Sequence, residues 1–211
     1  MLKKIAAAIF LLISFLVFTV CAGNIGDIGS SRTQEQKLGA ITGAQQGGQP
    51  EPQKQRKVLV VYFSHSGNTR EMAQQIHEQV GGDIMELQTV APYPNNYLSL
   101  VIQAREERQA GFKPPLITKI TDISSYDVIF LGFPIWGETI PAPITTFLAE
   151  YDLSGKTIAP FCTHGGWGAG QSVAAITERS PRSVVLNVLA VESKNVKTSQ
   201  NEIAQWSQKV K

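Results

Sequence analysis

Two stretches of this chain are apolar at nearly every position, and each has the length of a strand. Residues 58–63 (VLVVYF) and 128–133 (VIFLGF) are continuous runs of β-branched, aliphatic and aromatic residues. Such runs are typical of strands buried on both faces, as in parallel sheets, because a strand with one solvated face alternates apolar with polar residues. The pattern therefore favours a sheet that helices cover on both sides.

Segments with helical periodicity separate these strands from further ones. Met72, Ile76 and Val80 recur every four residues, and Gly81-Gly82 ends the first predicted helix. Five strands alternating with helices predict an α/β fold with a doubly wound five-stranded parallel sheet. The other predicted helices lie at 97–110, around 143–148, at 172–179 and at the C-terminus, and the other strands at 83–87, 157–163 (weakened by Pro160) and 183–191.

The composition excludes several classes of protein. Hydrophobic residues make up 43% of the chain and charged residues 17%, which is enough apolar side chain to build a core. The net charge is +2, and residues 57–211 carry 13 Lys and Arg against 14 Asp and Glu. A nucleic-acid-binding surface needs a clear basic excess, so we expect no nucleic-acid partner.

The first 22 residues have the pattern of a signal peptide. Lys3-Lys4 precede an apolar run over 5–20, and small or β-branched residues favour cleavage after Ala22. Two alternatives stay open: an uncleaved membrane anchor, and lipidation at Cys21. The run is shorter than the ~20 apolar residues of a spanning helix, which favours cleavage.

Residues 23–56 are rich in Gly, Gln and Ser and show no apolar period, so we expect a flexible linker before a domain over 57–211. The domain is predicted to be exported, in the periplasm or outside the cell. It would be tethered to a membrane only through the N-terminal segment, if that segment stays uncleaved or is lipidated at Cys21.

Ligands of open parallel sheets bind beyond the carboxyl ends of the strands, where the strand order reverses. The first loop at such a position is Ser64-His65-Ser66-Gly67-Asn68-Thr69, which gathers hydroxyl and amide groups at a helix N-terminus and is suited to a phosphate. No Lys follows Gly67, so this is not a P-loop. An ordinary capped turn uses the same residue types and is the alternative.

The second loop is Pro134-Ile135-Trp136-Gly137, where the indole could stack on a flat heterocycle or could belong to the core. The third is Thr163-His164-Gly165-Gly166, whose glycines allow a planar ring to approach the backbone. No G-x-S-x-G motif accompanies it, which argues against an esterase. Cys162 and His164 lack an orienting third group, and the histidines have no metal-ligand spacing, so we expect neither Cys–His catalysis nor a metal site.

Together these three loops resemble those of the flavodoxin family, over residues 57–211, and Pro92-Tyr93-Pro94 recurs in one branch of it. The resemblance implies a flavodoxin-like sheet with strand order 2-1-3-4-5 and flavin mononucleotide (FMN) as cofactor. It implies that the first loop holds the phosphate, through hydroxyls and backbone amides without a basic side chain. The second and third loops would then flank the flavin ring.

Two redox functions follow from this resemblance, and a flavin-free binding module is a third possibility. The first is an electron-transfer protein that docks with redox partner proteins. The alternative is an NAD(P)H-dependent FMN quinone-type oxidoreductase. Along the sequence, Arg70 is the one basic residue that adjoins the loops, and no nicotinamide-binding motif occurs. Both observations favour the carrier.

Overall fold

Strands and helices alternate along the chain as the sequence predicts. The computed structural model describes residues 55–210, so the predicted signal peptide (1–22) and nearly all of the predicted linker lie outside the described residues. The strands are β1 (Val58–Tyr62), β2 (Asp83–Glu86), β3 (Val128–Pro134), β4 (Thr157–His164), β5 (Val184–Val185) and β6 (Leu189–Glu192). The helices are α1 (Asn68–Val80), α2 (Tyr97–Ala110), α3 (Ala142–Glu150), α4 (Ser172–Arg179) and α5 (Gln200–Val210), with short 3₁₀ turns at Ile123–Ser125 and Ser193–Thr198.

The strands form one sheet in the order β2-β1-β3-β4-β5, and β6 also pairs with β4. Every pair of named strands is parallel. The predicted fold class and strand order are therefore confirmed. Because the order reverses between β1 and β3, the carboxyl ends of these two strands mark the position where a ligand of such a sheet binds.

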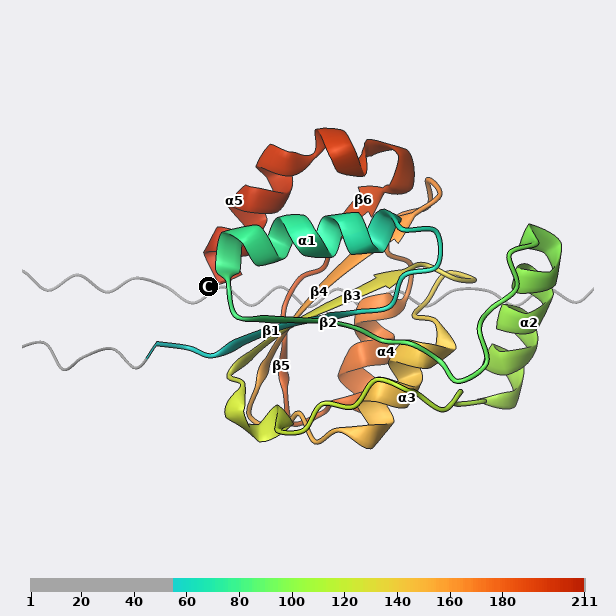
Figure 1. Ribbon diagram of the computed structural model, residues 1–211, viewed down its shortest axis with the longest axis horizontal. Helices are drawn as coiled ribbons and strands as arrows, with labels where there is room; N and C mark the ends of the chain where they lie inside the picture. Colours follow the sequence, from blue (N-terminus) through green and yellow to red (C-terminus); the bar gives the residue numbers. More distant parts are fainter. Residues whose placement is uncertain (1–54, 211) are drawn as a thin grey trace, which may run out of the picture. The chain divides into compact units, whose positions relative to one another are not determined.

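Alternate residues of the buried strands face opposite helical layers. Val60 packs in one apolar cluster with Met72 of α1 and Ile203 of α5. Val61, the next residue, belongs to a second cluster with Ile144 of α3 and residues of α4. Figure 1 shows α1 and α5 on one face of the sheet and α3 and α4 on the other. All five residues of β1 are buried, as the continuous apolar run predicts.

The predicted last strand, 183–191, is interrupted in the structure. β5 pairs with the first two residues of β4 and β6 with its last four, which leaves Ala159 and Pro160 unpaired on this side. Proline has no N–H to donate to a neighbouring strand, so the break falls where β4 lacks a donor. On its other side β4 keeps its register with β3, and Pro160 lies opposite Leu131.

Helix α2 lies at the end of the sheet where β1 and β3 end (Figure 1). The Asn96 side chain caps it by accepting the Ser99 N–H at 3.0 Å, and Gly111 ends it with φ +62°. Its buried residues are Leu100 and Glu107, so most of the helix surface is open to solvent. Within residues 55–210, no helix is both long and apolar enough to cross a membrane.

Candidate cofactor-binding site

The loop after β1 leaves backbone donors available at the start of α1. Gly67 adopts φ +91°, and no side chain caps the helix at this residue. Ser64 Oγ accepts the Arg70 N–H at 3.2 Å, as in an ordinary turn. The N–H groups of residues 66–69, however, donate to no protein group in the described part of the chain. Free N–H groups at the positive end of a helix dipole are suited to an anion, so this donor set fits a phosphate.

Side chains of the same loop are held by their neighbours. Asn68 Nδ2 donates to Ser66 Oγ at 3.1 Å, which keeps the Ser66 hydroxyl beside the helix start. His65 Nε2 donates to the Pro94 carbonyl at 3.1 Å, so this nitrogen carries the proton. The His65 bond joins the loop to the segment that leads into α2.

Thr163, the first residue of the third predicted loop, connects all three loops. Its hydroxyl lies 2.8 Å from the Thr69 hydroxyl, and both side chains are buried. Its carbonyl accepts the Ile135 N–H at 2.8 Å. The Thr69 hydroxyl is thus engaged inside the protein, while its backbone N–H stays available for a ligand.

A tight turn follows β3, which ends at Pro134. The Trp136 N–H donates to the Thr139 carbonyl at 3.1 Å, and the two residues form an antiparallel bridge. The residues between them, Gly137 and Glu138, have φ values of +58° and +67°. Two consecutive positive φ angles are typical of a type I′ turn, and at Glu138 such an angle costs roughly 1–3 kcal/mol.

The Trp136 ring is surrounded by other rings but is only partly buried. Tyr93 contacts it edge-on with a centroid distance of 4.9 Å, and Phe63 with 5.4 Å. His65 of the first loop lies at 5.9 Å. Part of the indole therefore packs against the core, and the rest is exposed to solvent. The core interpretation thus describes only part of the Trp136 ring, and stacking on a flat ligand stays a prediction.

The loop after β4 folds around the ring of His164. The Nδ1 atom accepts the N–H groups of Gly166 at 3.0 Å and Gly168 at 3.2 Å, so it carries no proton. The histidine therefore fixes the shape of its own loop. Gly165 and Gly166 are exposed beside it, and Trp167 is 91% exposed.

The segments that directly follow the second and third loops also contact each other. The Gln171 N–H donates to the Glu138 carbonyl at 2.8 Å. A Cβ atom on Gly170 would lie 2.2 Å from the same carbonyl oxygen, so the two backbones approach as closely as glycine permits. Because Gly170 also has φ +54°, both its conformation and its surroundings require the absence of a side chain.

The structure gives no support to a catalytic cysteine. Cys162 is fully buried within β4, and burial raises the pKa of its thiol to about 12. A thiol of this kind stays protonated at neutral pH and is a poor nucleophile. Within residues 55–210, no group of three or more His, Cys, Asp or Glu side chains is placed to hold a metal ion.

Arg70 is the one basic residue that adjoins the loops along the sequence, but the structure brings further arginines close to them in space. Arg108 of α2 extends over the turn after β3, and a Cβ atom on Gly137 would lie 1.8 Å from its Nη1 atom. Arg108 and Arg179 both line a hollow that Trp136 and the start of α3 also line. No hydrogen bond or ion pair within the described residues involves the Arg108 guanidinium.

The structure gathers all the residues predicted for the site at one edge of the sheet, in the loops after β1, β3 and β4. Four contributors were not predicted: Phe63 and Tyr93, which surround Trp136, Glu138 in the turn, and Arg108 on α2. The Pro92-Tyr93-Pro94 motif was a signal for Tyr93. Nothing local in the sequence indicates that Arg108 contacts a glycine 29 residues later along the chain.

Comparison with known proteins agrees with this geometry. The family model described as "Flavodoxin" matches residues 57–210. The flavodoxin of Megasphaera elsdenii is 29% identical over 128 residues, which cover 58% of this chain and 75% of that protein. A solved structure from Bacteroides uniformis, assigned as a flavoprotein, is 28% identical with a TM-score of 0.66, covering 74% of this chain and 99% of that one.

A flavoprotein of Lactobacillus acidophilus, solved in complex with FMN, shares the fold. It is 24% identical with a TM-score of 0.58, covering 68% of this chain and 97% of that one. The family match spans most of the chain, so this protein belongs to the flavodoxin family. Flavodoxins bind FMN at the switch point between β1 and β3. The family therefore assigns FMN to this chain as its cofactor.

Proposed function

We propose that this protein is an FMN-binding electron-transfer protein of the cell envelope that exchanges electrons with redox partner proteins. The observation that carries the FMN part of this proposal is the junction at Thr163. Its hydroxyl and its carbonyl connect the first loop, with its free N–H groups, to the two loops proposed to flank the flavin. A phosphate and an attached ring system can thus be held by one connected set of loops.

Each loop has a separate task in this proposal. The N–H groups of residues 66–69, with the hydroxyls of Ser64 and Ser66, bind the phosphate. Trp136 offers its accessible side to the ring, and Gly165 and Gly166 let the backbone approach another edge. When bound, FMN supplies exchange of one or two electrons, and the protein supplies position and shielding from water.

Reconstitution tests this proposal. The purified protein is mixed with FMN, excess flavin is removed by gel filtration, and the bound flavin is measured by absorbance. We expect one FMN per chain. Riboflavin, which lacks the phosphate, should bind much more weakly, because each hydrogen bond to a charged group contributes about 1.5–3 kcal/mol. A protein that elutes colourless would contradict both redox functions.

One observation favours the NAD(P)H-dependent quinone-type oxidoreductase as a second candidate. Arg108 and Arg179 line a hollow beside Trp136, so cationic side chains for a second anionic substrate are present near the site. Stopped-flow mixing of the FMN-loaded protein with excess NADH or NADPH, without oxygen, separates the two functions. Bleaching on the order of 1 per second or faster would indicate an enzyme. Slower bleaching supports the carrier.

The proposed location in the cell envelope is supported by the residues before the domain. Lys3-Lys4, the apolar run and the small residues before position 23 are the pattern of an export signal. Mass spectrometry of the protein purified from its native cells distinguishes three N-termini: cleavage after Ala22, lipid on Cys21, or an intact segment. Recovery of an intact, unlipidated chain from the cytoplasmic fraction would contradict export.

A further inference from the structure

A bidentate ion pair lies beside the first loop. Arg70, in the first turn of α1, donates from Nε to Glu86 Oε2 at 2.9 Å and from Nη2 to Oε1 at 2.6 Å. Glu86 is the last residue of β2, and Tyr62 at the end of β1 donates to the same carboxylate at 3.5 Å. A fork of this kind fixes the plane and direction of the guanidinium.

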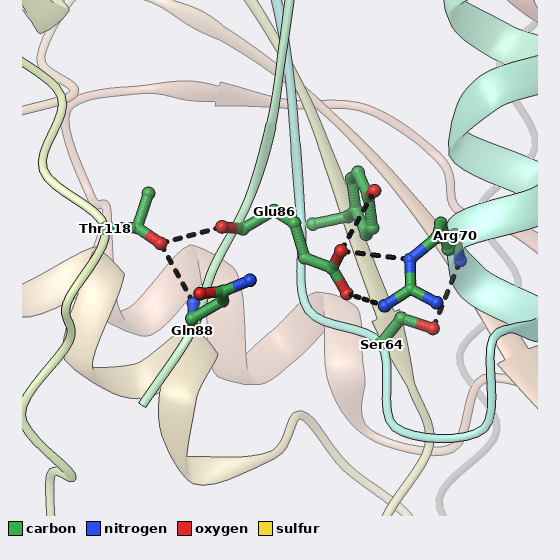
Figure 2. A network of polar contacts seen from close by, with 6 residues as sticks. Ser64, Arg70, Glu86, Gln88 and Thr118 are labelled. Carbon is green, nitrogen blue, oxygen red and sulfur yellow. Dashed lines mark hydrogen bonds and ion pairs between the residues drawn. The ribbon is translucent and has the colours of Figure 1, made fainter. Parts of the chain in front are cut away.

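The ion pair leaves the third nitrogen of Arg70 free. Nη1 donates to no group within the described residues, and it lies 4.0 Å from the position of a Cβ atom on Gly67. Figure 2 shows the Ser64 side chain next to the guanidinium, with its hydroxyl accepting the Arg70 backbone N–H. The unused nitrogen therefore lies close to Gly67 of the first loop, beside the residues whose N–H groups have no protein partner.

The Arg70 side chain lies at the surface and is open to solvent. The Arg70 side chain is 47% exposed, and Glu86 is 20% exposed beneath it. Ser64, His65, Arg70 and Glu86 line a common surface hollow of about 320 Å³. The carboxylate of Glu86 raises the pKa of Arg70, so the guanidinium keeps its positive charge.

We infer that Arg70 binds the phosphate of FMN through its free Nη1, with Glu86 holding the guanidinium in the required orientation. This inference rests on the proposed FMN binding and changes one part of it. The sequence predicts a phosphate held by hydroxyls and backbone amides without a basic side chain, whereas the structure brings one arginine to the same loop. Arg70 is thus a residue that selects a phosphorylated flavin over riboflavin.

A purely structural function for Arg70 is the competing explanation. The ion pair joins α1 to β2, so Arg70 could serve the fold alone or simply neutralise Glu86 near the phosphate. These explanations predict different results. A fold role affects FMN and riboflavin equally, because both need the same loops. If Arg70 only neutralises Glu86, removing the carboxylate together with the guanidinium should restore the FMN affinity of wild type.

The test measures dissociation constants of FMN and riboflavin by fluorescence titration of the full chain and its variants. Loss of one hydrogen bond to a charged group corresponds to about a 10- to 100-fold change. We expect Arg70→Gln to weaken FMN by that factor and to leave riboflavin within about twofold. We expect the double variant Arg70→Gln with Glu86→Gln to stay at least about tenfold weaker for FMN than wild type.

Arg182→Gln is the matched control. Arg182 also pairs with a carboxylate, Asp152 at 3.4 Å, but it precedes β5 at the opposite end of the sheet. The variant loses the same charge and should bind both flavins like wild type. Equal losses of FMN and riboflavin in Arg70→Gln, unchanged FMN affinity in that variant, or wild-type FMN affinity in the double variant would each overturn the inference. Failure of wild type to bind FMN would instead overturn the proposed function.

Discussion

The close approach of Gly170 to Glu138 predicts a graded effect of alanine substitutions along one loop. Gly165, Gly168 and Gly170 all follow β4, but their surroundings differ. At Gly165 φ is not positive, and no atom beyond its two chain neighbours lies within 4 Å of the point that an alanine Cβ would occupy. Gly168 has φ +71° with the same empty surroundings, whereas Gly170 combines φ +54° with a Cβ position 2.2 Å from the Glu138 carbonyl oxygen.

These differences predict three different losses in the free energy of unfolding. Gly165→Ala should change the free energy of unfolding by less than about 0.5 kcal/mol, as an exposed substitution does. Gly168→Ala should lose about 1 kcal/mol, because a left-handed alanine costs roughly 1–2 kcal/mol and a stiffer unfolded chain offsets part of it. Gly170→Ala should lose roughly 2–4 kcal/mol, since overpacking adds about 1–3 kcal/mol and a backbone carbonyl is the atom that must move.

Urea denaturation of the FMN-free protein measures the three costs, and FMN titration measures their functional effect. Gly170→Ala should also weaken FMN binding, because it displaces the Glu138 turn that follows Trp136. Gly168→Ala should bind FMN more tightly than Gly170→Ala does. Equal unfolding midpoints for Gly168→Ala and Gly170→Ala would refute the reasoning, since the contact with Glu138 would then contribute nothing. If Gly165→Ala lowered the free energy of unfolding as much as Gly168→Ala does, the penalty assigned to a left-handed alanine would be refuted.

Three further predictions concern single side chains. Trp136→Ala should lower FMN affinity by roughly 1–3 kcal/mol in a fluorescence titration, the scale of a stacking contact, and lost stability with unchanged affinity would assign the ring to the core alone. Tyr93→Phe should lower the unfolding free energy by about 1.5–3 kcal/mol in urea, because Tyr93 donates to the buried Glu107 carboxylate at 2.7 Å, and an unchanged midpoint would argue against that bond. Burial raises the pKa of Cys162 to about 12, above the unfolded value of about 8.5, so its contribution to stability is full below pH 8.5 and is lost as the pH rises towards 12. In a Cys21→Ser background, a thiol reagent at pH 8 should therefore label Cys162 only after unfolding, and rapid labelling of the native protein would contradict its burial.

The sequence predicts the buried strands well because burial on both faces needs apolar residues at successive positions. Residues 58–63 and 128–133 leave no polar face, and the observed β1 and β3 fall within one residue of these ranges. The interruption between β5 and β6 is not predicted. From the sequence, Pro160 weakens the prediction of its own strand, but in the structure its missing N–H breaks the pairing of the neighbour. The effect of one residue on another strand depends on register, which local sequence does not contain.

In the site, too, some features are predictable from the sequence and others are not. The three loops are predictable because glycine, hydroxyl and amide residues directly follow buried strands. The contacts between loops are not, since the bonds of Thr163 to Thr69 and Ile135 join residues far apart in sequence. Arg108 reaches Gly137 only because α2 stands at the carboxyl end of the sheet. Long flexible side chains make such contacts from positions that no spacing rule marks.

The interruption opposite Pro160 also has a consequence for association between molecules. A long, regular edge strand presents a row of unpaired N–H and C=O groups, to which a strand of another chain can add. Here that edge consists of a strand of two residues and one of four, separated by a break in the ladder. Each of these two strands is too short for a strand of a second chain to pair with it stably. The proline in β4 thus protects this edge of the sheet against strand addition and aggregation.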